Sequence, residues 1–282
     1  MSVAATPPRR RRLRVSIPGT IGLAVILFWL VMAAIGPLVA PYSAGRVVDG
    51  DMLAPISRAF PLGTDYLGRD MLSRVLLGTR FTVGLALLAT FLASLTGTTL
   101  ALCSAVNGGW IDAVTSRLLD ALISVPSLMF SLVIIASLGS SVPVLVVTAA
   151  VIYTPGAYRT ARSLAVNVNA MDFVKVARAR GERAFFIMRE EILPNMVLPV
   201  LTDFGLRFVF VVLLLSGLSF LGLGIQPPNA DWGSLVRENL EGLAYGAPAV
   251  IMPAVAIATL TIAVNLLIDN LPTRRGPGAD ER

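Results

Sequence analysis

The chain has 282 residues, of which 55% are hydrophobic and 14% charged, and its mean hydropathy is +0.77. This balance excludes an ordinary soluble domain and indicates an integral membrane protein. Because the sequence has no histidine and a single cysteine, Cys103, it also excludes intrachain disulfides, Cys/His zinc sites and acid–base chemistry by histidine. A metal site made only of carboxylates stays open.

Six stretches are long and apolar enough to cross the ~30 Å of bilayer hydrocarbon as helices, which takes about 20 residues each. The predicted spans are 17–40, 81–106, 118–138, 142–158, 197–223 and 247–271. Only LGSSVP separates the third from the fourth. The alternative for the first is a signal peptide, but its apolar run of about 22 residues exceeds the usual h-region, which favours a retained span.

Basic residues are distributed unevenly between the two sides of this arrangement. Sixteen of the 23 Lys and Arg fall on the side that holds both termini, in the N-terminal arm, at Arg117, in the segment 159–189 and in the C-terminal tail. The positive-inside rule places that side in the cytoplasm. The net charge of +6 is therefore a topology signal, with contacts to anionic lipid as a side effect, and it does not indicate nucleic-acid binding.

Two loops on the opposite side contain short amphipathic patterns. Over 66–77, apolar residues recur at helical spacing while Arg69 and Arg74 fall elsewhere, which predicts a helix lying on the outer membrane surface. A similar pattern begins at Trp232 in the loop after the fifth span. Trp232 and Tyr245 are expected at the level of the lipid headgroups.

Several residues inside the spans are candidates for gating or for lining a path. Pro126 and Pro155 should bend or loosen their helices, either as packing kinks or as parts of a gate. Ser216 opens a stretch of small residues that favours close helix packing over a path-lining role.

Asp203 and Arg207 lie deep in the fifth span, four residues apart and so on one helix face. Their place in its cytoplasmic half favours a structural pair or an inner gate over a proton relay.

Motifs for catalysis are missing from the sequence. The only lysine, Lys175, follows Val174, so no P-loop is present, and neither GxSxG nor HExxH occurs. An ion-coupled carrier or channel remains the alternative to a subunit driven by other proteins.

The most charged stretch, 171–195, predicts a cytoplasmic helix–bend–helix unit. Asp172 can cap the first helix, Gly181 can take the left-handed conformation that ends it, and a second helix should run from about residue 184 until Pro194 stops it. Apolar residues among the charges suit insertion into a groove on another protein. The alternative is an amphipathic loop resting on the membrane.

DFVKVARARG followed by EILPN resembles the cytoplasmic loop of bacterial ABC importer permeases, whose pattern is EAA, a glycine four residues on, and a distant ILPN. The matching residues are Ala177, Gly181, Ile192, Leu193, Pro194 and Asn195. Lys175 and Val176 stand where Glu and Ala are usual.

Three longer stretches resemble the C-type permeases of dipeptide, oligopeptide and nickel importers. They are FPLGTDYLGRDMLSR at 60–74, GGWIDAVTSRLLDALISVPSLMF at 108–130 and LSFLGLGIQPPNADWG at 218–233. The C-terminal NLLIDNLPTRRG at 265–276 departs from the family pattern, so nothing is carried over to that end.

The resemblance implies an all-α type I importer fold with six transmembrane helices and both termini in the cytoplasm. It divides the chain into a basic tail (1–16), a first helix with an external loop (17–79), a transmembrane core (80–271) and a second tail (272–282). It implies a bacterial inner-membrane subunit that is not an enzyme and binds no cofactor, because ATP and Mg belong to partner subunits.

The implied partners are a homologous second permease, two cytosolic ATP-binding subunits, an extracytoplasmic substrate-binding protein and membrane lipid. The loop 172–195 is then the coupling element that docks on an ATPase. Its candidate residues are Asp172, Lys175, Ala177, Arg178, Gly181, Ile192, Leu193, Pro194 and Asn195. Relatives carry dipeptides, oligopeptides, nickel chelates or glutathione, so the substrate stays open.

Overall fold

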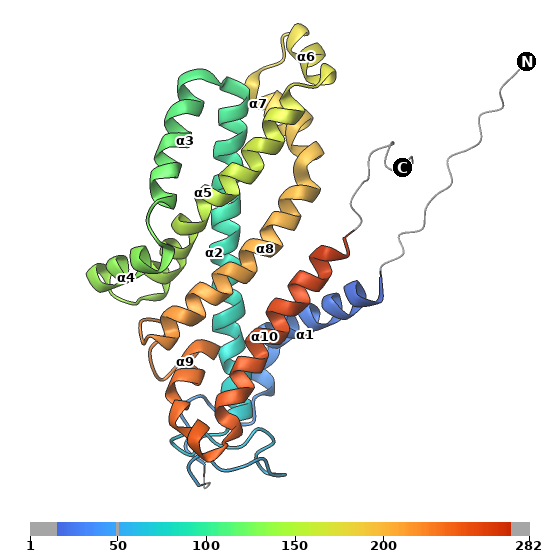
Figure 1. Ribbon diagram of the computed structural model, residues 1–282. Coiled ribbons are helices and arrows are strands. Elements are labelled where there is room, and N and C mark those ends of the chain that lie inside the picture. Colours follow the sequence, from blue (N-terminus) through green and yellow to red (C-terminus); the bar gives the residue numbers. More distant parts are fainter. Residues whose placement is uncertain (1–15, 49–50, 272–282) are drawn as a thin grey trace, which may run out of the picture.

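The computed structural model describes residues 16–48 and 51–271, and these form an all-helical chain (Figure 1). The helices are α1 (Ile17–Val39), α2 (Met71–Asn107), α3 (Gly109–Ile123), α4 (Ser127–Leu138), α5 (Val142–Asn169), α6 (Asp172–Ala179), α7 (Ala184–Phe186), a π-helix η1 (Ile187–Ile192), α8 (Leu193–Phe220), α9 (Trp232–Glu238), a 3₁₀ helix η2 (Leu240–Tyr245) and α10 (Pro248–Asp269). Of the two predicted tails, 1–16 and 272–282, all but Ser16 lie outside the described residues.

Five described helices are long and apolar enough to cross a bilayer, and the bent pair of α3 and α4 makes a sixth. The predicted six spans are matched if that pair is taken as one span, but the starts of the second, third and fifth spans and the end of the fourth were wrong, with the third beginning at Gly109 rather than residue 118. The second span begins at Met71 rather than residue 81, because the Asp70 carboxylate caps the helix by accepting from the Ser73 amide at 2.9 Å. The expected surface helix over 66–77 does not exist as a separate element, since residues 71–77 form about the first two turns of α2.

The fourth span extends to Asn169, well past the predicted end at residue 158. The extra turns carry Arg159 and Arg162, whose guanidinium groups pair with Asp120 and Asp112 on α3. Ion pairs with a neighbouring helix thus let α5 continue where hydropathy alone ends the span.

The third span is broken rather than straight. α3 and α4 meet at 85°, and Pro126 is the residue that precedes α4 (Figure 1). A proline lacks the N–H that would continue the hydrogen bonds of α3, and it disfavours helical geometry at Val125 before it. The prediction that Pro126 bends its helix is confirmed, whereas Pro155 lies buried inside an α5 that continues through it.

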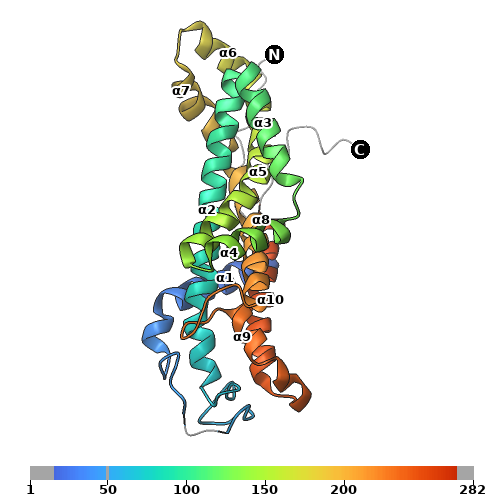
Figure 2. The ribbon, with the colours of Figure 1, turned by 90° about the vertical axis from the view of Figure 1, so that its left-hand side faces the viewer.

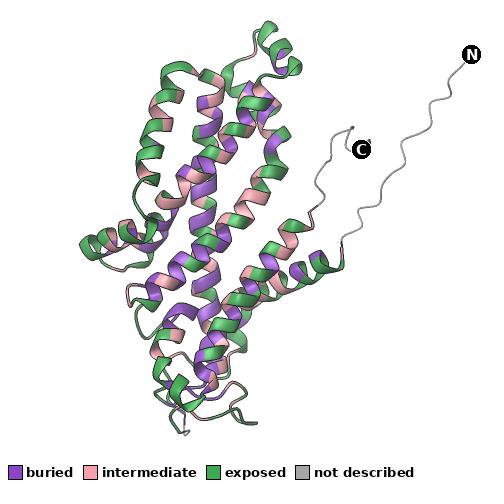
Figure 3. Ribbon diagram, viewed as in Figure 1, coloured by how far each residue is buried: buried purple, intermediate pink, exposed green. Residues whose placement is uncertain are grey.

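α2 is the central helix, packed along α5 and also against α1 and α8. Figure 3 shows buried residues along its length, while the outer faces of α1 and α4 are largely exposed. α1 pairs with α10, where the Trp29 indole N–H donates to Thr259 Oγ1 at 3.2 Å, and the Ser16 and Asn270 side chains are in contact. The two ends of the helical domain therefore lie on one side, as both-termini-inside topology requires.

The short helix predicted near Trp232 is present as α9, but Trp232 does not lie at the headgroup surface. Its side chain is fully buried, stacks edge-on against Trp29 and donates from Nε1 to the Val75 carbonyl at 3.1 Å. A backbone acceptor inside the protein removes the need for the indole N–H to reach water. Tyr245, by contrast, is exposed.

Candidate functional site

The segment 171–195 projects from one end of the molecule, opposite the loop 40–70 and α9 (Figure 2). Within it, Gly181 has φ +84° and ends α6 as predicted. Its amide donates to the Arg178 carbonyl at 2.9 Å, and the Glu182 amide donates to the Ala177 carbonyl at 3.2 Å, the pair of bonds of a Schellman motif. A sharp bend after α6 is therefore built into the backbone.

Asp172 does not cap α6, contrary to the prediction. Met171 is the capping residue, and no side chain bonds the first turn. Asp172 is the first helical residue instead, where its carboxylate accepts from Lys175 Nζ at 2.9 Å. This hydrogen bond, reinforced by the charge of Lys175, lowers the pKa of Asp172.

Pro194 does not stop the second helix, which runs continuously from Ala184 to Phe220. The backbone widens into π geometry just before the proline, and the Leu193 amide donates five residues back, to Met188. Pro194, which has no N–H to donate, directly follows this wide turn, and the helix continues past it. The segment is consequently joined to a membrane-spanning helix without a break.

The base of the segment is packed against the ends of the spans. Val174, Ala177 and Ile192 are fully buried, and Val174 and Ile192 belong to an apolar cluster with residues of α2 and α5. Arg178 Nη2 donates to Asn169 Oδ1 at 2.8 Å, and Asn169 Nδ2 donates to the Ala105 carbonyl at 2.8 Å. Hydrogen bonds thus link α6, α5 and α2 around Asn169.

The outward side of the segment combines apolar and charged groups. The exposed fractions are 38% for Phe173, 56% for Val176 and 67% for Phe185. Pro194 and Asn195 are also exposed, and Leu193 is half-buried. A fixed base with apolar side chains directed outward is the arrangement that a partner groove would accept.

The predicted pairing of Asp203 with Arg207 is present. Arg207 Nη2 donates to Asp203 Oδ1 at 2.8 Å, and both side chains are mostly buried. Ser216 is buried too, and the backbone of Gly233 in α9 approaches it closely. Pro155 lies in the stretch of α5 that Arg207 contacts at Tyr153 and Thr160, whereas Pro126 lies apart from it, at the α3–α4 break.

An outer charge cluster of four residues, Asp65, Arg69, Arg74 and Glu238, was missed by the sequence analysis. Asp65 Oδ2 accepts from Arg69 Nε at 2.6 Å and from Arg74 Nη1 at 2.7 Å, and Arg74 Nη1 also donates to Glu238 at 2.7 Å. The expected exposure of Arg69 and Arg74 on a surface helix was wrong, because both are buried. The charges of the two acids and two arginines cancel. The sequence alone does not show this, because Glu238 joins the cluster only when α9 packs beside α2.

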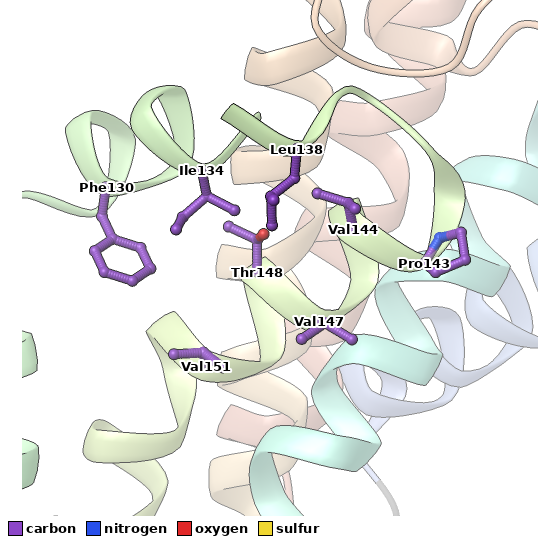
Figure 4. A pocket seen from close by; sticks show the side chains of 8 residues that line it. All are labelled: Phe130, Ile134, Leu138, Pro143, Val144, Val147, Thr148 and Val151. Carbon is purple, nitrogen blue, oxygen red and sulfur yellow. The ribbon is translucent and has the colours of Figure 1, made fainter. Parts of the chain in front are cut away.

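A groove between α4 and α5 is lined by apolar residues and Thr148 (Figure 4). Its lining includes Phe130, Ile134 and Val147, with no charged side chain. It therefore offers little to orient a polar ligand. Among residues 16–48 and 51–271, no group of three or more acidic or cysteine side chains is placed to hold a metal ion.

Comparisons with known proteins agree on one family. Residues 93–276 match the model of the binding-protein-dependent transport system inner membrane component. The chain is 32% identical over 264 residues to the glutathione transport system permease protein GsiD of Pectobacterium atrosepticum, covering 93% of this chain and 87% of that protein. It is 29% identical over 251 residues to the dipeptide transport system permease protein DppC of Alkalihalophilus pseudofirmus, covering 89% and 83%.

A solved structure titled an amino acid ABC transporter with histidines shares the fold, with a TM-score of 0.50, 20% identity and coverage of 71% of this chain and 91% of that one. Permeases of such systems bind no cofactor themselves and work with a substrate-binding protein and ATPase partners. The chain therefore belongs to the family of binding-protein-dependent transport system inner membrane components and is a multi-pass permease subunit of an ABC importer, not an ATPase itself.

Proposed function

We propose that this permease imports glutathione, dipeptides or closely similar small peptides. This proposal is supported by the similarity to GsiD and DppC over about nine-tenths of the chain. We further propose that the chain, with 80–271 as its transmembrane core, pairs with a homologous second permease. Two ATPase subunits and one substrate-binding protein complete the proposed importer.

The segment 171–195 is proposed as the coupling element that docks on one ATPase. Three observations support it: the apolar side chains directed outward, the buried base, and the unbroken continuation into α8. A force applied to such a segment passes directly into α5 and α8, the two spans that flank it. Tilting these spans would switch the path between inward-facing and outward-facing states.

The substrate is tested on the complete importer with the substrate-binding protein encoded beside this gene. The binding protein is purified, and its ligand is identified by mass spectrometry. Uptake of radiolabelled glutathione and of a dipeptide is then measured in proteoliposomes containing ATP. We expect uptake of at least one of them that depends on both ATP and the binding protein, whereas uptake by the permease alone would support the carrier or channel reading.

Docking is tested by deleting residues 178–186. Because α5 and α8 do not depend on these residues to form, we expect membrane insertion at normal yield and loss of ATPase co-purification. Substituting Arg117 on α3 with alanine is a matched control that removes a positive charge elsewhere on the same side. Co-purification of the ATPase at wild-type yield after the deletion would overturn the docking assignment.

A further inference from the structure

Arg207 of α8 reaches across to α5, beyond its pairing with Asp203. Its Nη2 donates to Thr160 Oγ1 at 3.2 Å and its Nη1 to the Tyr153 carbonyl at 3.4 Å. Only 12% of the Arg207 side chain and 18% of the Asp203 side chain are exposed. The guanidinium therefore has one acceptor on its own helix and two on the neighbouring helix.

Gly156 makes room for this contact. A Cβ added to Gly156 would lie 2.4 Å from Arg207 Nη1 and 3.2 Å from Cζ. The guanidinium thus lies directly on the backbone of α5, where any side chain at position 156 would displace it. Since the obstructed atoms are the flexible end of a side chain, a methyl group there would move the guanidinium without moving the helix.

A third hydrogen bond joins the same two helices, with its donor on α5. The Tyr153 hydroxyl donates to the Phe210 carbonyl of α8 at 3.0 Å. Residues 153–160 of α5 and 203–210 of α8 are therefore connected by donors from both helices.

These contacts lie at matched depth on the two helices that flank the segment 171–195. Arg207 is 14 residues from the start of α8, about 21 Å along the helix at 1.5 Å per residue, and its partners Thr160 and Tyr153 are nine and 16 residues from the end of α5, about 14 and 24 Å. Within the bilayer, a guanidinium separated from its acceptors would be left unpaired at high cost. Separation or sliding of α5 against α8 is thereby opposed.

We propose that Arg207, held by Asp203 and admitted by Gly156, is a positioning residue that clamps α5 to α8, so that displacement of the segment 171–195 moves both helices as one unit. The inference rests on the proposed role of that segment in coupling. It assigns to the Asp203–Arg207 pair the transmission of movement, and neither proton transfer nor substrate contact. Without the clamp, ATP hydrolysis continues while less substrate moves for each ATP.

The test uses Gly156→Ala in the complete importer, reconstituted with its ATPases and substrate-binding protein. We expect normal assembly and basal ATPase activity, but a fall of roughly fivefold or more in substrate transported per ATP, as for other energetic couplings between sites. Gly217→Ala is the control, since Gly217 lies on α8, the helix of Arg207, and an added Cβ there meets no atom within 4 Å. Unchanged transport per ATP in Gly156→Ala would overturn the clamp.

Two further measurements separate the clamp from a merely structural role. Spin labels at Val166 and Val197, both exposed near the ends of α5 and α8, should give a narrow distance distribution in the wild type and a broader one in Gly156→Ala. The double variant Asp203→Leu with Arg207→Met removes both charges together and should retain yield but lose transport per ATP. An unbroadened distribution in Gly156→Ala, or normal coupling in the double variant, would count against the clamp.

The wild-type complex decides the proposed function separately. Its uptake must depend on ATP and on the binding protein, whatever the variants do. If wild-type uptake shows this dependence and Gly156→Ala matches it, the clamp fails and the importer assignment stands. If wild-type uptake lacks the dependence, the proposed function fails first.

Discussion

Arg74 is positively charged although its side chain is only 2% exposed, and the carboxylates of Asp65 and Glu238 compensate this charge. Removing Arg74 leaves Arg69 alone to face Asp65 and Glu238, so one buried negative charge is uncompensated, and breaking a buried ion pair in this way costs about 3–5 kcal/mol. We therefore expect Arg74→Met to lower the thermal unfolding midpoint of the detergent-purified permease, measured by intrinsic fluorescence of its tryptophans.

The matched variant adds Asp65→Asn to Arg74→Met. The Leu67 and Arg69 amides donate to Asp65 Oδ1 at 2.9 and 2.8 Å, and asparagine keeps an oxygen to accept from them. It also removes the negative charge that Arg74→Met leaves in excess. The double variant should recover much of the lost stability. If Arg74→Met unfolds at the wild-type temperature, the outer charge cluster is not holding the loop to α2 and α9.

Gly181 determines the bend of the backbone after α6. Its φ of +84° strains any residue with a Cβ, and no atom lies within 4 Å of a Cβ built there, so the cost of substitution comes from the backbone alone. We expect Gly181→Ala to weaken ATPase co-purification, and Gly181→Asn to weaken it less because asparagine tolerates the left-handed region. Equal retention of the ATPase by both variants and the wild type would show that the bend is dispensable.

At the scale of elements, Asn169 joins three helices at the base of the segment 171–195. It accepts from Arg178 of α6 and donates to Ala105 of α2 while ending α5. Removing it should release α6 from the ends of the spans. We expect Asn169→Ala to increase amide hydrogen exchange over 172–179 by roughly tenfold, the equivalent of about 1.4 kcal/mol of local opening.

Arg180 provides the comparison for Asn169. Its guanidinium is exposed and lies 3.7 Å from the Glu191 carboxylate, which is too long for a hydrogen bond. Arg180→Met should therefore leave the exchange of α6 nearly unchanged. Hydrogen exchange followed by mass spectrometry resolves both variants in nanodiscs. Equal exchange in Asn169→Ala and the wild type would assign the order of α6 to its apolar base instead.

Hydropathy and turn residues predicted most elements of this chain, and the exceptions have identifiable causes. Gly181 and Pro126 act locally, so their effects were readable from neighbouring residues. The early start of α2 at Met71 was not, because Arg74 and Arg80 interrupt the apolar pattern after the Asp70 cap, and the burial of Arg74 depends on Asp65 and Glu238, which are brought to it by the fold. Trp232 was misplaced for the same reason, since its acceptor is the backbone of Val75, far away in sequence.

At the scale of the molecule, the segment 171–195 and η2 lie at opposite ends and should face opposite sides of the membrane. The single cysteine makes this testable, because Cys103→Ser gives a cysteine-free background. We expect Tyr245→Cys to react with a membrane-impermeant maleimide in intact spheroplasts, and Phe185→Cys to react only in inside-out vesicles. Both side chains are exposed, so reaction of both from one side would overturn the orientation.

The pairing of α1 with α10 has a consequence for the order of synthesis. Trp29 and its partner Thr259 are 230 residues apart, so the first helix enters the bilayer long before its neighbour has been made. At roughly 5–20 residues per second, that interval lasts about 10–50 s. During this time α1 must stay in the bilayer without its partner helix. The native packing of α1 against α10 can form only after α10 has left the ribosome.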